Sequence, residues 1–141
     1  MRDIELLQYI HETAAMGIEG LQDVSGRIHD SGLMKCVQSQ IREYQSIAIE
    51  AAKLLKSMGE TPKEPSGMAR MSAGMMSAMQ TMTDSSASKI SELVINGNHM
   101  GITKGLKHLH DYAGDDDRIR RLAEKLLATE QANVEQMKPF L

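Results

Sequence analysis

The sequence predicts an all-α protein folded as an antiparallel four-helix bundle. Four long stretches repeat apolar residues at intervals of three and four, which is the spacing of one face of a helix. Turn-forming residues separate these stretches, and no segment shows the alternation of a β-strand. The 141 residues have the length of one ordinary domain. We expect a helical hairpin over residues 2–59, a loop and a short Met-rich helix over residues 60–83, and a second helical hairpin over residues 84–138.

The first hairpin consists of two apolar stripes joined by a short turn. We place the turn at Asp30-Ser31-Gly32 and the end of the second helix at Gly59, because glycine commonly follows the last turn of a helix. A joint this short permits only an antiparallel arrangement. The stripes are Leu7, Ile10, Ala14, Gly17, Leu21, Val24 and Ile28, followed by Leu33, Val37, Gln40, Tyr44, Ile47, Ala51, Leu54 and Met58.

The connection between the hairpins is rich in methionine. Pro62 and Pro65 exclude a helix interior near residues 60–66, and we expect residues 67–82 to form a short helix. One face of that helix would carry thioethers at intervals of three and four, from Met68, Met71, Met75, Met79 and Met82. The sequence is compatible both with a crossover along the bundle and with a simple return.

The second hairpin begins with a capping sequence. Ser, Asp and Asn side chains favour helix starts, so residues 84–86 predict the start of the third helix and the acidic residues 115–117 that of the fourth. Gly114 and Pro139 are the predicted ends. The stripes are Ile90, Val94, Asn98, Ile102, Leu109 and Tyr112, followed by Ile119, Ala123, Leu126, Glu130, Asn133, Val134 and Met137.

Composition and charge restrict the class of function. The net charge is -3 at pH 7 and aromatic residues are only 3%, without tryptophan. Both values argue against binding to nucleic acid, and the charge argues against an anionic membrane. Cys36 is the only cysteine, which excludes an intrachain disulfide and suits a reducing compartment. We therefore expect a cytoplasmic protein.

Polar side chains interrupt the apolar stripes at about one common level of the bundle. When the second hairpin is folded about Gly114, Glu130 lies opposite Asn98. A buried carboxylate costs several kcal/mol unless it is paired, protonated or bound to a metal. We therefore expect Glu130 to have a partner at its depth. The candidates form a polar core layer of Gln40, Tyr44, Asn98 and Asn133.

Residues 40–46 and 126–134 resemble the metal-binding helices of the ferritin-like superfamily, whose di-iron bundles carry Glu-x-x-His motifs. The resemblance implies that Glu43 and Glu130 take carboxylate positions of a metal site. Ser46 and Asn133, however, stand where that family has histidines, and Asn98 stands at the level of a bridging glutamate. A di-iron centre needs roughly four carboxylates together with nitrogen donors, and this chain does not supply them.

The sequence therefore favours a non-catalytic ferritin-like bundle of bacterial type with a vestigial metal site and no cofactor. We expect a homodimer with a structural or interaction role and a protein partner of unknown identity. The first alternative is a metal-binding or metal-storage protein that holds iron or manganese with Glu43, Glu130 and His99. The second is a copper protein that uses the methionines, which otherwise fill an irregular gap. The enzymatic alternative is a di-iron oxidoreductase.

Overall fold

Helices account for all regular structure in the residues that the computed structural model describes, 1–63 and 82–141. These are α1 (Asp3–Ser25), α2 (Ser31–Ser57), α4 (Ala87–Asp111), α5 (Asp117–Met137) and a short 3-10 helix, η1 (Lys138–Phe140). The predicted all-α, four-helix architecture is confirmed. The predicted Met-rich helix, with Met68, Met71, Met75 and Met79, lies outside the described residues, which include only Met82 of that set.

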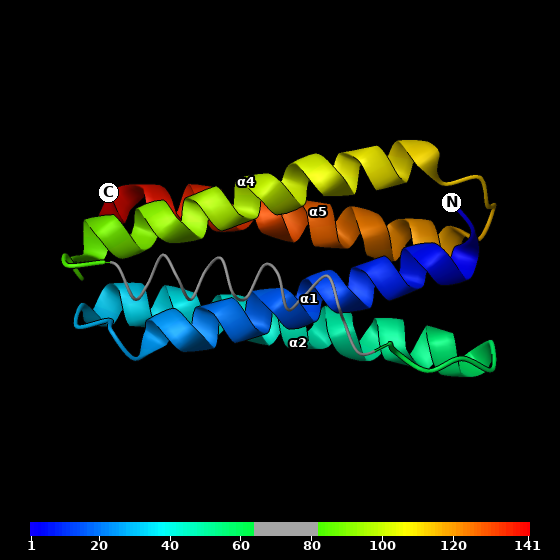
Figure 1. The fold of residues 1–141 in the computed structure, drawn as a ribbon, viewed down its shortest axis with the longest axis horizontal. Coiled ribbons are helices and arrows are strands. Elements are labelled where there is room, and N and C mark those ends of the chain that lie inside the picture. Colours follow the sequence, from blue (N-terminus) through cyan, green and yellow to red (C-terminus); the bar gives the residue numbers. More distant parts are fainter. Residues whose placement is uncertain (64–81) are drawn as a thin grey trace.

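The chain passes from one end of the bundle to the other between its two hairpins. α1 packs against α2, α4 packs against α5, and each pair is antiparallel (Figure 1). α2 ends at the opposite end of the bundle from the start of α4, so these two helices run in the same direction. The connection is therefore a crossover, which the sequence had left open.

Side-chain caps define where three of the helices begin. Asp30, Ser86 and Asp116 each accept a hydrogen bond from a backbone N–H of the first turn, at 2.9, 3.2 and 3.0 Å respectively, which satisfies a donor that the helix itself cannot satisfy. The starts predicted at residues 84–86 and 115–117 are confirmed. The turn of the first hairpin lies earlier than predicted, because Asp30 caps a helix that begins at Ser31 and contains Gly32.

The interior is apolar along most of its length, and all four long helices contribute to it. On α4 the buried face departs from the predicted stripe. It continues through Gly101 and Gly105, whereas Ile102 and Leu109 are only half-buried. The largest fully buried apolar side chains are Leu6, Leu7, Ile10, Leu33, Ile47, Leu55, Ile90, Ile119, Leu126 and Met137.

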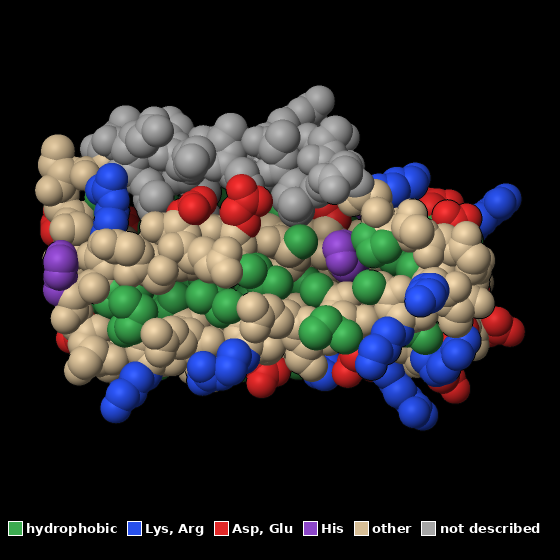
Figure 2. Space-filling view, turned by 90° about the horizontal axis from the view of Figure 1, so that it is seen from below, with side chains coloured by type: hydrophobic (Ala, Val, Ile, Leu, Met, Phe, Trp, Pro, Cys, Tyr) green, Lys and Arg blue, Asp and Glu red, His purple; other side chains and the backbone are tan. Residues whose placement is uncertain are grey.

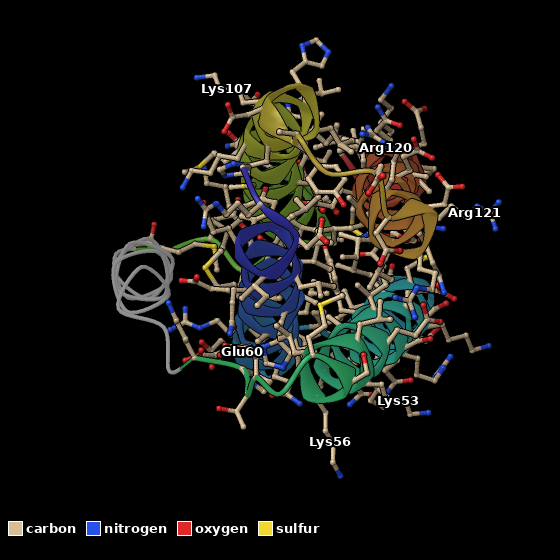
Figure 3. The ribbon with its side chains drawn as sticks, turned by 90° about the vertical axis from the view of Figure 1, so that its right-hand side faces the viewer. Lys53, Lys56, Glu60, Lys107, Arg120 and Arg121 are labelled. Carbon is tan, nitrogen blue, oxygen red and sulfur yellow. The ribbon has the colours of Figure 1, made fainter. Side chains whose placement is uncertain are left out.

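Most acidic and basic side chains of the described residues lie on the outside of the bundle. In the view along the helices, Lys53 and Lys56 on α2, Lys107 on α4 and Arg121 on α5 point away from the interior (Figure 3). On the face formed by α1 and α2, apolar side chains make a strip along the bundle, and most charged side chains lie beyond it (Figure 2). The outward-pointing charges fit the amphipathic spacing of the helices, whereas the apolar strip is a part of the apolar surface that the bundle leaves at its outside.

Candidate binding site

The polar side chains of the predicted core layer are all buried. Gln40, Tyr44, Asn98 and Asn133 are between 1% and 6% exposed, and Glu130 is 3% exposed. They come from α2, α4 and α5, so the two hairpins together build the layer. They are buried because they lie on the helical stripes, which face the interior of the bundle.

Hydrogen bonds link only some of these side chains, in two separate pairs. The Tyr44 hydroxyl donates to Oδ1 of Asn98 at 3.0 Å, and Nδ2 of Asn98 donates to the Val94 carbonyl at 3.0 Å. Nε2 of Gln40 donates instead to Oε1 of Gln136 on α5 at 3.2 Å. None of these hydrogen bonds involves the carboxyl group of Glu130.

Glu130 has no hydrogen-bond or ion-pair partner within the described residues, and its Oε1 is buried without one. This corrects the expectation that Gln40, Tyr44, Asn98 or Asn133 would satisfy it. Burial raises the pKa of the Glu130 carboxyl from 4.5 to about 8, because a charged carboxylate loses its hydration there. The group is therefore mostly protonated at pH 7.

Two glycines make room for the buried polar groups. A Cβ atom on Gly101 of α4 would overlap the Glu130 carboxyl, and a Cβ atom on Gly17 of α1 would lie 2.6 Å from the Tyr44 ring. Glycine at each position lets the side chain of a neighbouring helix lie against the backbone. Sequence reasoning placed Gly17 on its stripe but missed Gly101. The signal was available, because Gly101 follows Asn98 by three residues on the same face.

A hollow of about 90 Å³ lies between α1 and α4, with Tyr44 of α2 and Glu130 of α5 reaching into it. We call it the glutamate pocket. Most residues of its described lining are apolar residues or glycines, and Glu130 is the only residue of that lining with an acidic or basic side chain. The lining residues are Thr13, Met16, Gly17, Gly20, Leu21, Tyr44, Val94, Gly97, Asn98, Gly101 and Glu130.

A second hollow, of about 400 Å³, continues along the same two helices and shares Thr13, Met16 and Gly101 with the glutamate pocket. Its remaining described lining is more polar, with Tyr9, Glu12, Lys104, Lys107 and His108. The Tyr9 and His108 rings pack at a tilt with centroids 4.1 Å apart. Burial raises the pKa of Tyr9 to about 12, and burial lowers that of His108.

The structure does not bring the three predicted metal ligands together. Glu130 is buried, whereas Glu43 and His99 are exposed on α2 and α4. The described residues contain no group of three His, Cys, Asp or Glu side chains that could hold a metal ion. One buried carboxylate does not fit a pair of divalent cations, which need several anionic ligands.

The exposure of Glu43 has a simple geometric cause. Consecutive residues of a helix are about 100° apart around its axis, and Glu43 precedes the buried Tyr44 by one position. Its side chain therefore points away from the face that carries Gln40 and Tyr44. Of the predicted methionine face, Met82 is half-buried and packs against the core.

One solved structure resembles this chain over nearly its full length. It is the crystal structure of a DUF305 fragment from Deinococcus radiodurans, with a TM-score of 0.77, 14% sequence identity, and coverage of 97% of this chain and 93% of that chain. At this identity the similarity shows the fold alone. No family model and no curated protein matches the sequence. Within the described residues, no helix is long and apolar enough to cross a membrane.

Proposed function

We propose that this protein is a non-catalytic binding protein, a helical bundle that takes a small ligand into the glutamate pocket. The carboxyl of Glu130 carries the proposal. It is 3% exposed, it has no partner among the described residues, and it reaches into a hollow. A buried polar group normally has a hydrogen-bond partner, so an unsatisfied one beside a hollow marks the place where a ligand atom would be stabilised.

The composition of the pocket supports binding rather than catalysis. General acid–base or nucleophilic chemistry needs two or more cooperating groups within hydrogen-bond reach. Besides Glu130, the only residues of the described lining with a hydroxyl or acidic group are Tyr44 and Thr13. The Tyr44 hydroxyl already donates to Asn98. Burial raises the pKa of Tyr44 further from neutrality, so this hydroxyl is not a ready base.

The same donor set favours a ligand other than iron or manganese. Glu130 is the only carboxylate in the described lining, and Asn98 and Tyr44 add neutral oxygens. A structural or storage site for divalent cations would need more negative charge than this. Elemental analysis of the purified protein tests directly whether iron or manganese is bound. One equivalent or more of iron or manganese that disappears in Glu130→Ala would overturn the proposal.

A fragment titration followed by NMR tests the proposal itself. Neutral, cationic and anionic fragments of a few atoms are added to labelled protein at millimolar concentration. We expect at least one class to shift the backbone resonances of Gly97, Asn98 and Gly101, with a weaker effect in Gly101→Ala, whose new methyl group takes space from the pocket. Gly105→Ala is the matched control, since its methyl group would meet only ordinary contacts at 3.8 Å. Shifts confined to other surfaces, or none, would refute a ligand at this site.

A further inference from the structure

The chemistry of the glutamate pocket points to one class of ligand. We propose that the pocket binds an organic ammonium, a small apolar group that carries a protonated amine, with the ammonium against Glu130. This inference rests on the proposed function and adds to it the charge and the chemical type of the ligand. It follows from which hydrogen-bonding atoms remain unused around the hollow and from the absence of cationic side chains in its described lining.

In the described lining of the pocket, the unused hydrogen-bonding atoms are mainly acceptors. Outside this lining, Nδ2 of Asn133 is a buried donor without a partner among the described residues. The hydrogen of the Tyr44 hydroxyl is used on Asn98, and Nδ2 of Asn98 donates to the Val94 carbonyl. The Tyr44 oxygen and Oδ1 of Asn98 each keep a lone pair, and Glu130 adds two oxygens. An ammonium group has three donors and no acceptor, so it complements this set, whereas a carboxylate or phosphate would meet no cation there.

Charge compensation favours the same ligand. Burial keeps Glu130 mostly protonated at pH 7, and the described lining of the pocket contains no cationic side chain. A cation beside the carboxyl supplies charge compensation, since an opposite charge within about 4–6 Å favours the ionised form. Ammonium binding should therefore displace the Glu130 proton. A neutral ligand would leave the proton in place, so the two cases differ in their dependence on pH.

The size of the pocket sets the size of the ligand. A cavity of about 150 Å³ accepts benzene, so one of about 90 Å³ holds about three to five non-hydrogen atoms. Met16, Leu21 and Val94 provide apolar contacts for a short alkyl chain. A larger amine would extend into the second hollow, which continues past Thr13 and Gly101.

The titratable side chains of α1 and α2 that face Glu130 are tyrosines, which stay neutral near pH 7. α2 presents Tyr44 and α1 presents Tyr9, and the pKa values of both are raised, mainly by burial. The neighbouring residues of α4, Asn98 and Gly101, do not ionise. His108, Lys104, Lys107 and Glu12 line the second hollow, and burial lowers the pKa of His108. Glu130 is thus the group expected to control the pH dependence.

The test compares three probes of similar size, propylammonium, propionamide and propionate, in NMR titrations from pH 6 to pH 9. We expect propylammonium to bind most tightly, with a dissociation constant of about 1 mM at pH 8, typical of a ligand with so few atoms. With the pKa of Glu130 at about 8, the affinity should rise about fifty-fold from pH 6 to pH 8 and less than about two-fold from pH 8 to pH 9.

Two variants separate the charge of Glu130 from the rest of the protein. Glu130→Gln keeps the shape of the side chain and should weaken propylammonium binding at pH 8 by at least about ten-fold and abolish its pH dependence. Glu124→Gln, an exposed position on the same helix, should behave as the wild type. Propionamide binding in the pocket as tightly as propylammonium, at all pH values, would refute the ammonium and leave the binding function intact. Absence of binding by all three probes would refute both.

Discussion

The ionisation of Glu130 should weaken the fold as the pH rises, and Glu130→Gln should remove that effect. The glutamine amide has nearly the shape of the protonated carboxyl but cannot lose a proton. The substitution therefore tests ionisation with little change in packing. In the wild type, burial raises the pKa of this carboxyl from 4.5 to about 8, and the described residues provide no cation to offset its charge.

The sign and the size of the effect follow from proton linkage. Between these two pKa values the folded protein holds the proton and the unfolded chain does not, so the stabilising contribution is complete below pH 4.5 and is lost as the pH rises through about 8. At 1.36 kcal/mol per pKa unit, the full difference is roughly 5 kcal/mol, of which about 3 kcal/mol is lost by pH 7. Relative to the wild type, the free energy of unfolding of Glu130→Gln should therefore increase by about these amounts as the pH rises.

Urea denaturation followed by circular dichroism at pH 4.5, 7 and 9 measures the effect. At each pH, the free energy of unfolding of the wild type is subtracted from that of the variant. The change of this difference with pH is the quantity to compare, because the constant cost of burying an amide cancels in it. Glu124→Gln on the exposed face of α5 controls for loss of a negative charge. An equal pH dependence in Glu130→Gln and the wild type would show that Glu130 ionises freely, and the inferred pocket would then lose its main support.

Three further outcomes are expected. Gly101→Ala should destabilise the protein by about 1–3 kcal/mol, since its methyl group would overlap the buried carboxyl. Gly105→Ala should stabilise the protein by up to about 1 kcal/mol. If thermal or urea unfolding showed Gly101→Ala to be more stable than Gly105→Ala, the packing described here would be contradicted. Tyr44→Phe should cost about 1–3 kcal/mol by leaving Oδ1 of Asn98 unpaired, and a double-mutant cycle with Asn98→Leu that shows no coupling would argue against this bond. Burial should keep the pKa of His108 below 6.5, and an NMR titration with a higher midpoint would disagree.

The fold was predictable because its determinants are local. The apolar spacing marks the helices, and Ser86 and Asp116 cap helices where the sequence predicted starts. Gly59, with a φ of 77°, follows the second helix as expected of a residue that adopts this conformation without strain. The crossover was not predictable, since a connection over residues 58–86 is long enough for either route.

The site was predictable in its position but not in its chemistry. Periodicity correctly placed Glu130, Asn98 and Tyr44 inside the bundle. It could not show that Tyr44 and Asn98 bond to each other and leave the carboxyl unpartnered, because that depends on side-chain directions across helices. It also gave no weight to Gly101, whose contribution is the absence of a side chain. Glu43 shows the same limit, as a shift of one position turns a candidate ligand toward water.

The coincidence of two destabilising features at one place argues for a ligand. A glycine inside a helix costs about 0.5–1 kcal/mol relative to alanine, and α4 has Gly101 where it faces α5. Glu130 then occupies the space so created with an acid that lacks a partner. Alanine and an apolar residue at these two positions would close the pocket and stabilise the bundle. A site that serves only the fold has no physical reason to combine both costs beside a hollow, whereas a binding site needs the space and the unsatisfied group together. A double variant, Gly101→Ala with Glu130→Leu, should therefore be more stable than the wild type and should bind none of the probes; a double variant that still binds propylammonium would place the site elsewhere.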